Sequence, residues 1–142
     1  MKNLLIYVVD DDEDDRYILR KAFEEHPAPC SITEFEDGQD LVDHIDAVAL
    51  TLPPNLVVLD LNMPRMNGFD ALTYLRSQPD WQSVPVAVLT TSDDDGDRRR
   101  SLELGASAYM VKPPNYANMM GIIQQGVELA REDASLSGPS LR

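Results

Sequence analysis

Two acidic segments of the chain could form one site for a metal ion or a proton. Asp60 directly follows an apolar run at residues 57–59, and Asp10 and Asp11 directly follow another at residues 4–9. Such runs are typical of strands buried in a parallel sheet. Carboxylates that lie close together repel one another, so a site of this kind usually binds a divalent cation or leaves one carboxyl group protonated. The sequence therefore predicts an acidic pocket that carries the function.

Short apolar runs alternate with helical patterns along the chain. Residues 14–25, for example, place Leu19, Ala22 and Phe23 on one helical face. Strict alternation predicts an α/β fold, a doubly wound, five-stranded parallel sheet with right-handed crossovers and helices on both faces. The expected strands are residues 4–9, 30–35, 56–59, 84–89 and 108–111, and the expected helices are residues 14–25, a segment from about 41 that ends before Pro53, and residues 69–78, 97–104 and 116–132.

Several polar residues fall at the ends of these predicted strands. An open α/β sheet binds its ligand outside the carboxyl ends of the strands, beside the point where the strand order reverses. Thr90 or Lys112 alone would be an ordinary strand-end or surface residue. Together with the acidic residues they predict one crevice, formed by Asp10, Asp11, Asp60, Thr90 and Lys112.

Composition limits the classes of function. The chain has 142 residues, 43% of them hydrophobic, which suits one compact domain. Twelve Lys and Arg against 25 Asp and Glu give a formal net charge of -13, which opposes nucleic-acid binding. The apolar run before Asp10 is too short for a signal peptide or a membrane span. We therefore expect a cytoplasmic protein with neither a nucleic acid nor a membrane as partner.

The motifs at the strand ends resemble those of the receiver domain of two-component response regulators, in a layout close to the small chemotaxis response regulator. The resemblance covers about residues 4–131. It implies a flavodoxin-like (β/α)5 fold with strand order 2-1-3-4-5, and phosphorylation of an aspartate by a partner histidine kinase. The matching segments are Val8-Val9-Asp10-Asp11, Asp60-Leu61-Asn62-Met63-Pro64 with Asn67-Gly68, Thr90, and Lys112-Pro113.

The resemblance also implies roles for the acidic residues. Asp60 matches the phosphoacceptor. Asp11, Asp60 and the backbone carbonyl of Asn62 would bind Mg2+ or Mn2+ directly, and Asp10 would bind it through water. The remaining acids of the first loop, residues 12–15, are expected to be helix-capping or surface groups.

Three further residues would respond to the phosphoryl group, and a fourth would orient one of them. Lys112 would pair first with Asp60 and then with the phosphoryl group, and Thr90 would donate its hydroxyl to a phosphoryl oxygen. Pro113 follows Lys112 in a peptide that is often cis in the family and would aim the lysine into the pocket. Tyr109 matches the aromatic residue that turns inward on activation. The alternative for Tyr109 is a half-buried strand tyrosine whose hydroxyl stays in water.

Residues 133–142 are rich in Ser and Gly and have no apolar period. They are predicted to be a disordered tail after a receiver domain at residues 1–132, with no output module. A stand-alone response regulator would act through protein contacts. Its expected partners are a sensor histidine kinase or phosphotransfer protein and a downstream protein target, and a second copy of the chain is a further candidate. The expected interaction surface is formed by the fourth helix, the fifth strand and the fifth helix.

Two other classes of function stay open. One is a phosphorylation-independent adaptor. The other is a Mg2+-dependent phosphohydrolase with Asp60 as the nucleophile. Asn62 stands where such an enzyme would carry a second aspartate as acid-base, so we expect no enzyme activity beyond self-phosphorylation from phosphodonors and self-dephosphorylation.

Overall fold

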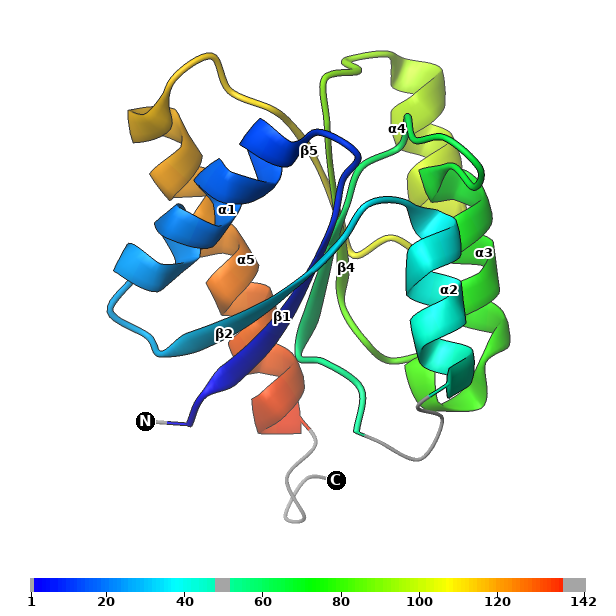
Figure 1. Ribbon diagram of the computed structural model, residues 1–142, viewed down its shortest axis with the longest axis horizontal. Coiled ribbons are helices and arrows are strands. Elements are labelled where there is room, and N and C mark those ends of the chain that lie inside the picture. The colour runs from blue at the N-terminus through cyan, green and yellow to red at the C-terminus, as the bar shows by residue number, and fades with distance from the viewer. Residues whose placement is uncertain (1, 48–51, 137–142) are drawn as a thin grey trace.

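The computed structural model describes residues 2–47 and 52–136 and contains a five-stranded parallel sheet (Figure 1). The strand order is β2-β1-β3-β4-β5, which confirms the predicted flavodoxin-like fold. The elements are β1 (Leu4–Val9), α1 (Glu13–Glu25), β2 (Cys30–Phe35), α2 (Gly38–Ala47), β3 (Leu56–Leu59), α3 (Gly68–Ser77), the 3-10 helix η1 (Pro79–Trp81), β4 (Val86–Thr90), α4 (Asp95–Glu103), β5 (Ala108–Val111) and α5 (Tyr116–Leu136).

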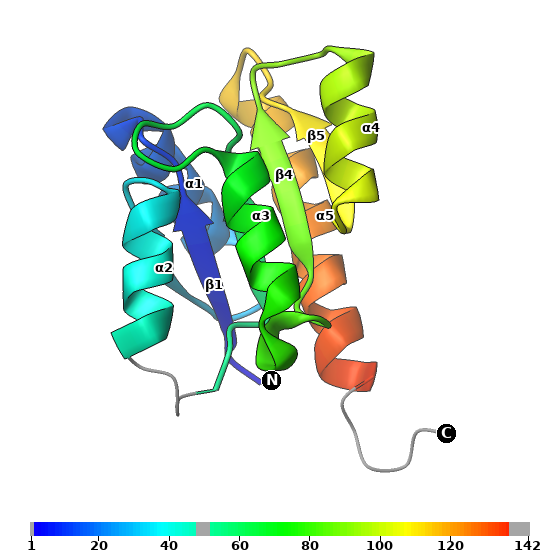
Figure 2. The ribbon, with the colours of Figure 1, turned by 90° about the vertical axis from the view of Figure 1, so that its right-hand side faces the viewer.

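The sheet separates two apolar cores. α1 and α5 cover one face, and α2, α3 and α4 cover the other (Figures 1 and 2). Because successive strand residues point to opposite faces, Ile6 and Val8 of β1 enter the α1/α5 core, whereas Tyr7 and Val9 enter the α2/α3 core. Strands buried on both faces explain the continuous apolar runs in the sequence. Among the described residues, the helices lack the combination of length and hydropathy that a bilayer-spanning segment needs.

Side chains in the preceding loops cap the starts of three helices. The Asp12 carboxylate accepts hydrogen bonds from the backbone N–H groups of Asp14 and Asp15 at the start of α1. Asn67 caps α3 and Asp94 caps α4 in the same way. Such caps satisfy backbone donors that have no partner within the helix. The caps at Asp12 and Asn67 fix the starts of α1 and α3 directly after the loops that follow β1 and β3.

Some element ends differ from the predicted ones. β4 begins at Val86 and includes Thr90, α4 begins at Asp95, and η1 is an additional short helix. α5 continues to Leu136, beyond the predicted helix end at residue 132. The predicted tail therefore begins within α5, and its residues 137–142 lie outside the described residues.

Arg76 ties the end of α3 to the turn after α4, at the end of the sheet opposite the predicted site. Its guanidinium group donates hydrogen bonds to the carbonyl oxygens of Trp81 (2.7 Å), Val84 (2.8 Å) and Gly105 (2.8 and 3.1 Å). Gly105 has a φ of 106°, in the left-handed region that favours glycine. The backbone just after α4 is thus fixed to α3.

Candidate functional site

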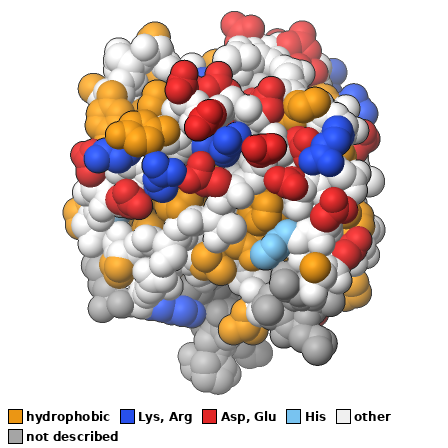
Figure 3. All heavy atoms as spheres, in the orientation of Figure 1, with side chains coloured by type: hydrophobic (Ala, Val, Ile, Leu, Met, Phe, Trp, Pro, Cys, Tyr) orange, Lys and Arg blue, Asp and Glu red, His pale blue; other side chains and the backbone are white. Residues whose placement is uncertain are grey.

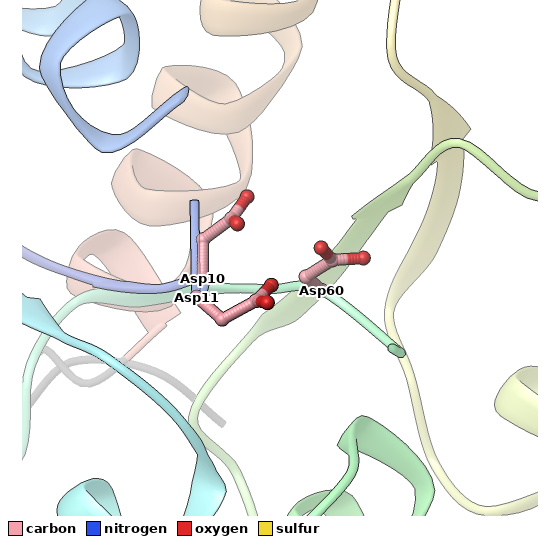
Figure 4. A group of neighbouring side chains, drawn as sticks. All are labelled: Asp10, Asp11 and Asp60. Atoms are coloured by element: carbon pink, nitrogen blue, oxygen red, sulfur yellow. The ribbon is translucent and has the colours of Figure 1, made fainter. Parts of the chain in front are cut away.

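Asp10, Asp11 and Asp60 lie together at the carboxyl ends of β1 and β3 (Figure 4). Each offers a carboxylate oxygen, and the three oxygens lie within 4.8 Å of one another. The backbone N–H of Asp60 donates to the carbonyl oxygen of Val9 at 3.0 Å, which fixes the two strand ends side by side. Asp10 and Asp60 are buried and Asp11 is exposed. The structure therefore has the predicted acidic pocket.

Lys112 reaches this pocket from the end of β5. Its Nζ atom lies 2.8 Å from Asp10, 2.8 Å from Asp15 and 3.1 Å from Asp60. Burial lowers the pKa of Lys112, but hydrogen bonds to Asp10 and Asp15 and the charges of Asp10 and Asp60 outweigh burial, so the pKa is raised. Lys112 is therefore a permanent positive charge among carboxylates.

The peptide between Lys112 and Pro113 is trans, because no peptide bond of the described residues is cis. The cis form that this lysine–proline peptide often has in the family is therefore absent here. The backbone N–H of Lys112 donates to the carbonyl oxygen of Thr90 at 2.7 Å. This bond continues the pairing of β4 with β5 and directs the lysine to the carboxyl ends of the strands.

Asp10 is held by contacts on both its side chain and its backbone. Its carboxylate accepts the backbone N–H of Asp12 at 2.9 Å. Arg16 of α1 donates to the Asp10 carbonyl oxygen at 2.6 Å and pairs with Glu34 of β2 at 3.3 Å. Burial raises the pKa of Asp10 to about 6, although the contacts with Lys112 and with the Asp12 N–H lower it. A nearby cation would favour the ionised form of this buried carboxyl group.

The donor set of the pocket fits a hard divalent cation. Three carboxylates converge, and oxygen is the ligand atom that Mg2+ and Mn2+ prefer. The buried acid Asp10, with its raised pKa, already pairs with a positive charge in Lys112. Asn62 is exposed in the loop between β3 and α3, two residues after Asp60.

Thr90 and Tyr109 lie on the neighbouring strands, next to the loop after β4. Thr90 is fully buried, and its hydroxyl oxygen accepts the backbone N–H of Ser92 at 3.3 Å. Tyr109 is also buried, and its hydroxyl donates to the carbonyl oxygen of Ser92 at 2.8 Å. The Arg98 guanidinium lies 4.7 Å from the centre of the Tyr109 ring. The tyrosine is therefore buried, and its hydroxyl has a protein partner.

Sequence reasoning missed one charged residue at the site. Asp15 was expected to be a capping or surface group, but its carboxylate pairs with Lys112. Its neighbour Asp14 is exposed, and the ion pairs of the described residues do not include it. Asp12 does cap α1, as expected. The available signal was that Asp15 lies in the first turn of a helix, close to a strand end. Asp14 lies there too, so this signal does not show which of the two reaches the site.

A parallel α/β sheet with carboxylates and a lysine at its strand ends defines a class of proteins that bind their ligands at that edge. The family model of the response regulator receiver domain matches residues 6–124. The chain therefore belongs to the receiver domains of two-component response regulators.

The chain is similar to several curated response regulators. Rcp1 of Synechocystis is 39% identical over 75 residues, which cover 53% of this chain and 50% of Rcp1. The match thus spans only half the length of Rcp1. PilH of Pseudomonas aeruginosa is 30% identical over 118 residues, which cover 83% of this chain and 93% of PilH.

Solved structures show the same fold. The phosphorylated cyanobacterial phytochrome response regulator RcpA superposes with a TM-score of 0.80 and 26% identity, covering 87% of this chain and 91% of that one. The Mn2+-bound form of Rcp1 superposes with a TM-score of 0.77 and 25% identity, covering 98% of this chain and 99% of that one. Receiver domains are signalling switches that bind Mg2+ or Mn2+ at their acidic pocket and interact with histidine kinases or phosphotransfer proteins.

Proposed function

We propose that this chain is a phosphorylation-controlled switch that accepts a phosphoryl group on Asp60 from a histidine kinase or a phosphotransfer protein. The observation that carries the proposal is the arrangement around Asp60, with the buried acid Asp10, the exposed acid Asp11 and the ammonium group of Lys112. A carboxylate nucleophile needs its own charge and that of the incoming phosphoryl group neutralised.

In the proposed reaction, a carboxylate oxygen of Asp60 forms a bond to the phosphorus of a phosphohistidine. The phosphorus–nitrogen bond breaks, and the imidazole leaves with that electron pair and takes up a proton. The product is an acyl phosphate on Asp60. Lys112, now 3.1 Å from Asp60, would then pair with a phosphoryl oxygen.

The metal would be held by Asp11, Asp60 and the backbone carbonyl of Asn62, and by Asp10 through water. When bound, Mg2+ or Mn2+ supplies positive charge that neutralises the phosphoryl oxygens. The binding of Mn2+ by Rcp1, which shares this fold, supports the assignment.

Thr90 and Tyr109 would carry the signal to the surface. If the Thr90 hydroxyl turns to donate to a phosphoryl oxygen, its contact with the Ser92 N–H changes. The Tyr109 hydroxyl is bonded to the carbonyl oxygen of the same serine. The loop after β4 therefore links the phosphorylation site to α4, where Leu102 is an exposed apolar side chain, and to β5, which α5 follows in the chain. We propose this surface as the interaction face for a downstream protein or a second copy.

The experiment that tests the proposal is intact-mass spectrometry after incubation with Mg2+ and acetyl phosphate. The wild-type protein should gain one labile phosphoryl group, and Asp60→Asn should gain none. Asp70→Asn removes an exposed carboxylate from the first turn of α3 and should behave like the wild type. An adduct that persists in Asp60→Asn would overturn the assignment of Asp60. Absence of any adduct in the wild type would favour a phosphorylation-independent adaptor.

A further inference from the structure

Lys112 and the proposed metal ion share two carboxylates. Asp10 and Asp60 belong to the triad that could hold the metal, and both pair with the Lys112 ammonium group, at 2.8 and 3.1 Å. Two cations held by the same carboxylates repel each other. Metal binding at this triad therefore requires the ammonium group to give up part of its contact with Asp10 and Asp60.

Asp15 offers the ammonium group a partner outside the triad. Its carboxylate lies 2.8 Å from Nζ, as close as that of Asp10, and it comes from α1 rather than from a strand end. The backbone N–H of Asp15 donates to the Asp12 side chain at 3.1 Å, so the helix cap fixes where this residue lies. The Lys112 side chain is 11% exposed, so water replaces a lost carboxylate partner poorly.

We propose that Asp15 is a positioning residue that holds the Lys112 ammonium group when Asp60, directly, and Asp10, through water, bind the metal, and that it thereby strengthens Mg2+ binding. The inference rests on the proposed function, because it concerns the same metal site. Without Asp15, the carboxylates that pair with Lys112 are Asp10 and Asp60, which the metal also needs. The ammonium group then stays between them and competes with the metal.

Asp14 provides a matched control for the effect of charge alone. It lies in the same helical turn as Asp15 and carries the same charge. It is exposed, and it takes no part in the ion pairs found among the described residues. Asp14→Asn therefore removes a nearby negative charge but leaves the contact with Lys112 intact.

The test is a Mg2+ titration at constant ionic strength, followed by calorimetry and by backbone amide NMR shifts. Asp15→Asn should weaken Mg2+ binding about fivefold, and Asp14→Asn by no more than about twofold. In a Lys112→Met background, Asp15→Asn should weaken binding no more than Asp14→Asn does. Asp15→Ser is a second variant, and far-UV circular dichroism verifies the fold of each protein.

Three results would count against the inference, and they are distinguishable. Equal effects of Asp15→Asn and Asp14→Asn would show that Asp15 acts only through its charge. If Asp15→Asn weakens Mg2+ binding about fivefold in the Lys112→Met background too, Asp15 does not act through the lysine. A wild-type protein that binds no Mg2+ would overturn the proposed metal site as well.

Discussion

The Asp10 side chain combines deep burial with a negative charge. Asp10 is 2% exposed, and burial raises its pKa from 3.8 to about 6 despite the contacts with Lys112 and the Asp12 N–H. The folded protein therefore binds this proton more tightly than the unfolded chain does. Ionised Asp10 destabilises the metal-free fold above about pH 6, and this effect disappears as the pH falls towards 4.

Asp10→Asn should therefore make the metal-free protein more stable at neutral pH, by about 1 kcal/mol. The difference from the wild type should shrink below about pH 6 and vanish near pH 4. Urea unfolding in the presence of a chelator, followed by circular dichroism across this range, measures it. Asp80→Asn, at an exposed position in η1, should leave the stability at neutral pH nearly unchanged. A less stable Asp10→Asn protein at neutral pH would mean that the ion pair with Lys112 outweighs burial.

At the scale of residues, the sequence predicted which side chains meet in the pocket but not all of their partners. Asp10, Asp60 and Lys112 could be predicted because the end of an apolar run is visible in one dimension. The contact between Asp15 and Lys112 could not be predicted, because it depends on which side of α1 faces β5. That orientation is set by the packing of α1 against α5 and the sheet, which a single-sequence pattern does not specify.

Among the elements, α3 begins close against the loop that carries Asp60. The backbone N–H of Gly68 donates to the carbonyl oxygen of Leu61 at 2.8 Å. A Cβ atom on Gly68 would lie 2.2 Å from the Asp60 carbonyl oxygen and 2.8 Å from the Leu61 Cα atom. Both neighbours are backbone atoms, so neither can move aside without moving the strand end. Glycine at this position lets the start of α3 approach the site.

Gly68→Ala should destabilise the protein by about 2 kcal/mol, because the added methyl group forces the backbone at Asp60 to shift. Gly121→Ala is the matched control. It lies in α5, and an added Cβ there meets no atom within 4 Å. Because alanine favours helix, that variant should gain roughly 0.5–1 kcal/mol. Thermal unfolding compares the two, and a Gly68→Ala protein as stable as the wild type would contradict the close approach.

The sequence predicted strands better than it predicted helix ends. β1, β2, β3 and β5 have the expected bounds. β1, β3 and β5 are short apolar runs between polar turns, whereas β2 mixes apolar and polar residues. α4 was expected to begin at residue 97 and begins at Asp95, because the side chain of Asp94 caps it. Within α4 the buried residue is Ser101, so this helix has almost no apolar pattern from which to predict its bounds.

Across the whole molecule negative charge is in excess, and on the face that Figure 3 displays it is unevenly distributed. The chain carries a formal net charge of -13. Figure 3 shows acidic side chains concentrated in the upper part of the face it displays, above the carboxyl ends of the strands in Figure 1. Charges of one sign repel each other across a compact surface, and at about 0.1 M ionic strength salt largely screens this repulsion between charges more than about 10 Å apart.

The metal-free protein should therefore become more stable as salt is added. Raising NaCl from about 10 to about 200 mM should raise the midpoint of thermal unfolding by a few degrees, equivalent to roughly 1 kcal/mol. Choline chloride should act equally, since screening does not depend on the identity of the cation. Differential scanning calorimetry with a chelator measures the effect. A midpoint that falls with salt would mean that favourable ion pairs, such as those of Lys112, outweigh the net repulsion.

The hydrogen bonds of Arg76 determine how α4 can move relative to the rest of the molecule. They fix Gly105, directly after the helix, to α3, whereas the loop before the helix is linked to β5 through the hydroxyl of Tyr109. A rigid helix fixed at one end moves by rotation about that end. With nine residues, α4 is about 13 Å long, so a rotation of about 10° shifts its N-terminus by about 2 Å while Gly105 stays in place. A displacement of the loop beside Thr90 would therefore move the helix end nearest the site most, while the far end stays against α3.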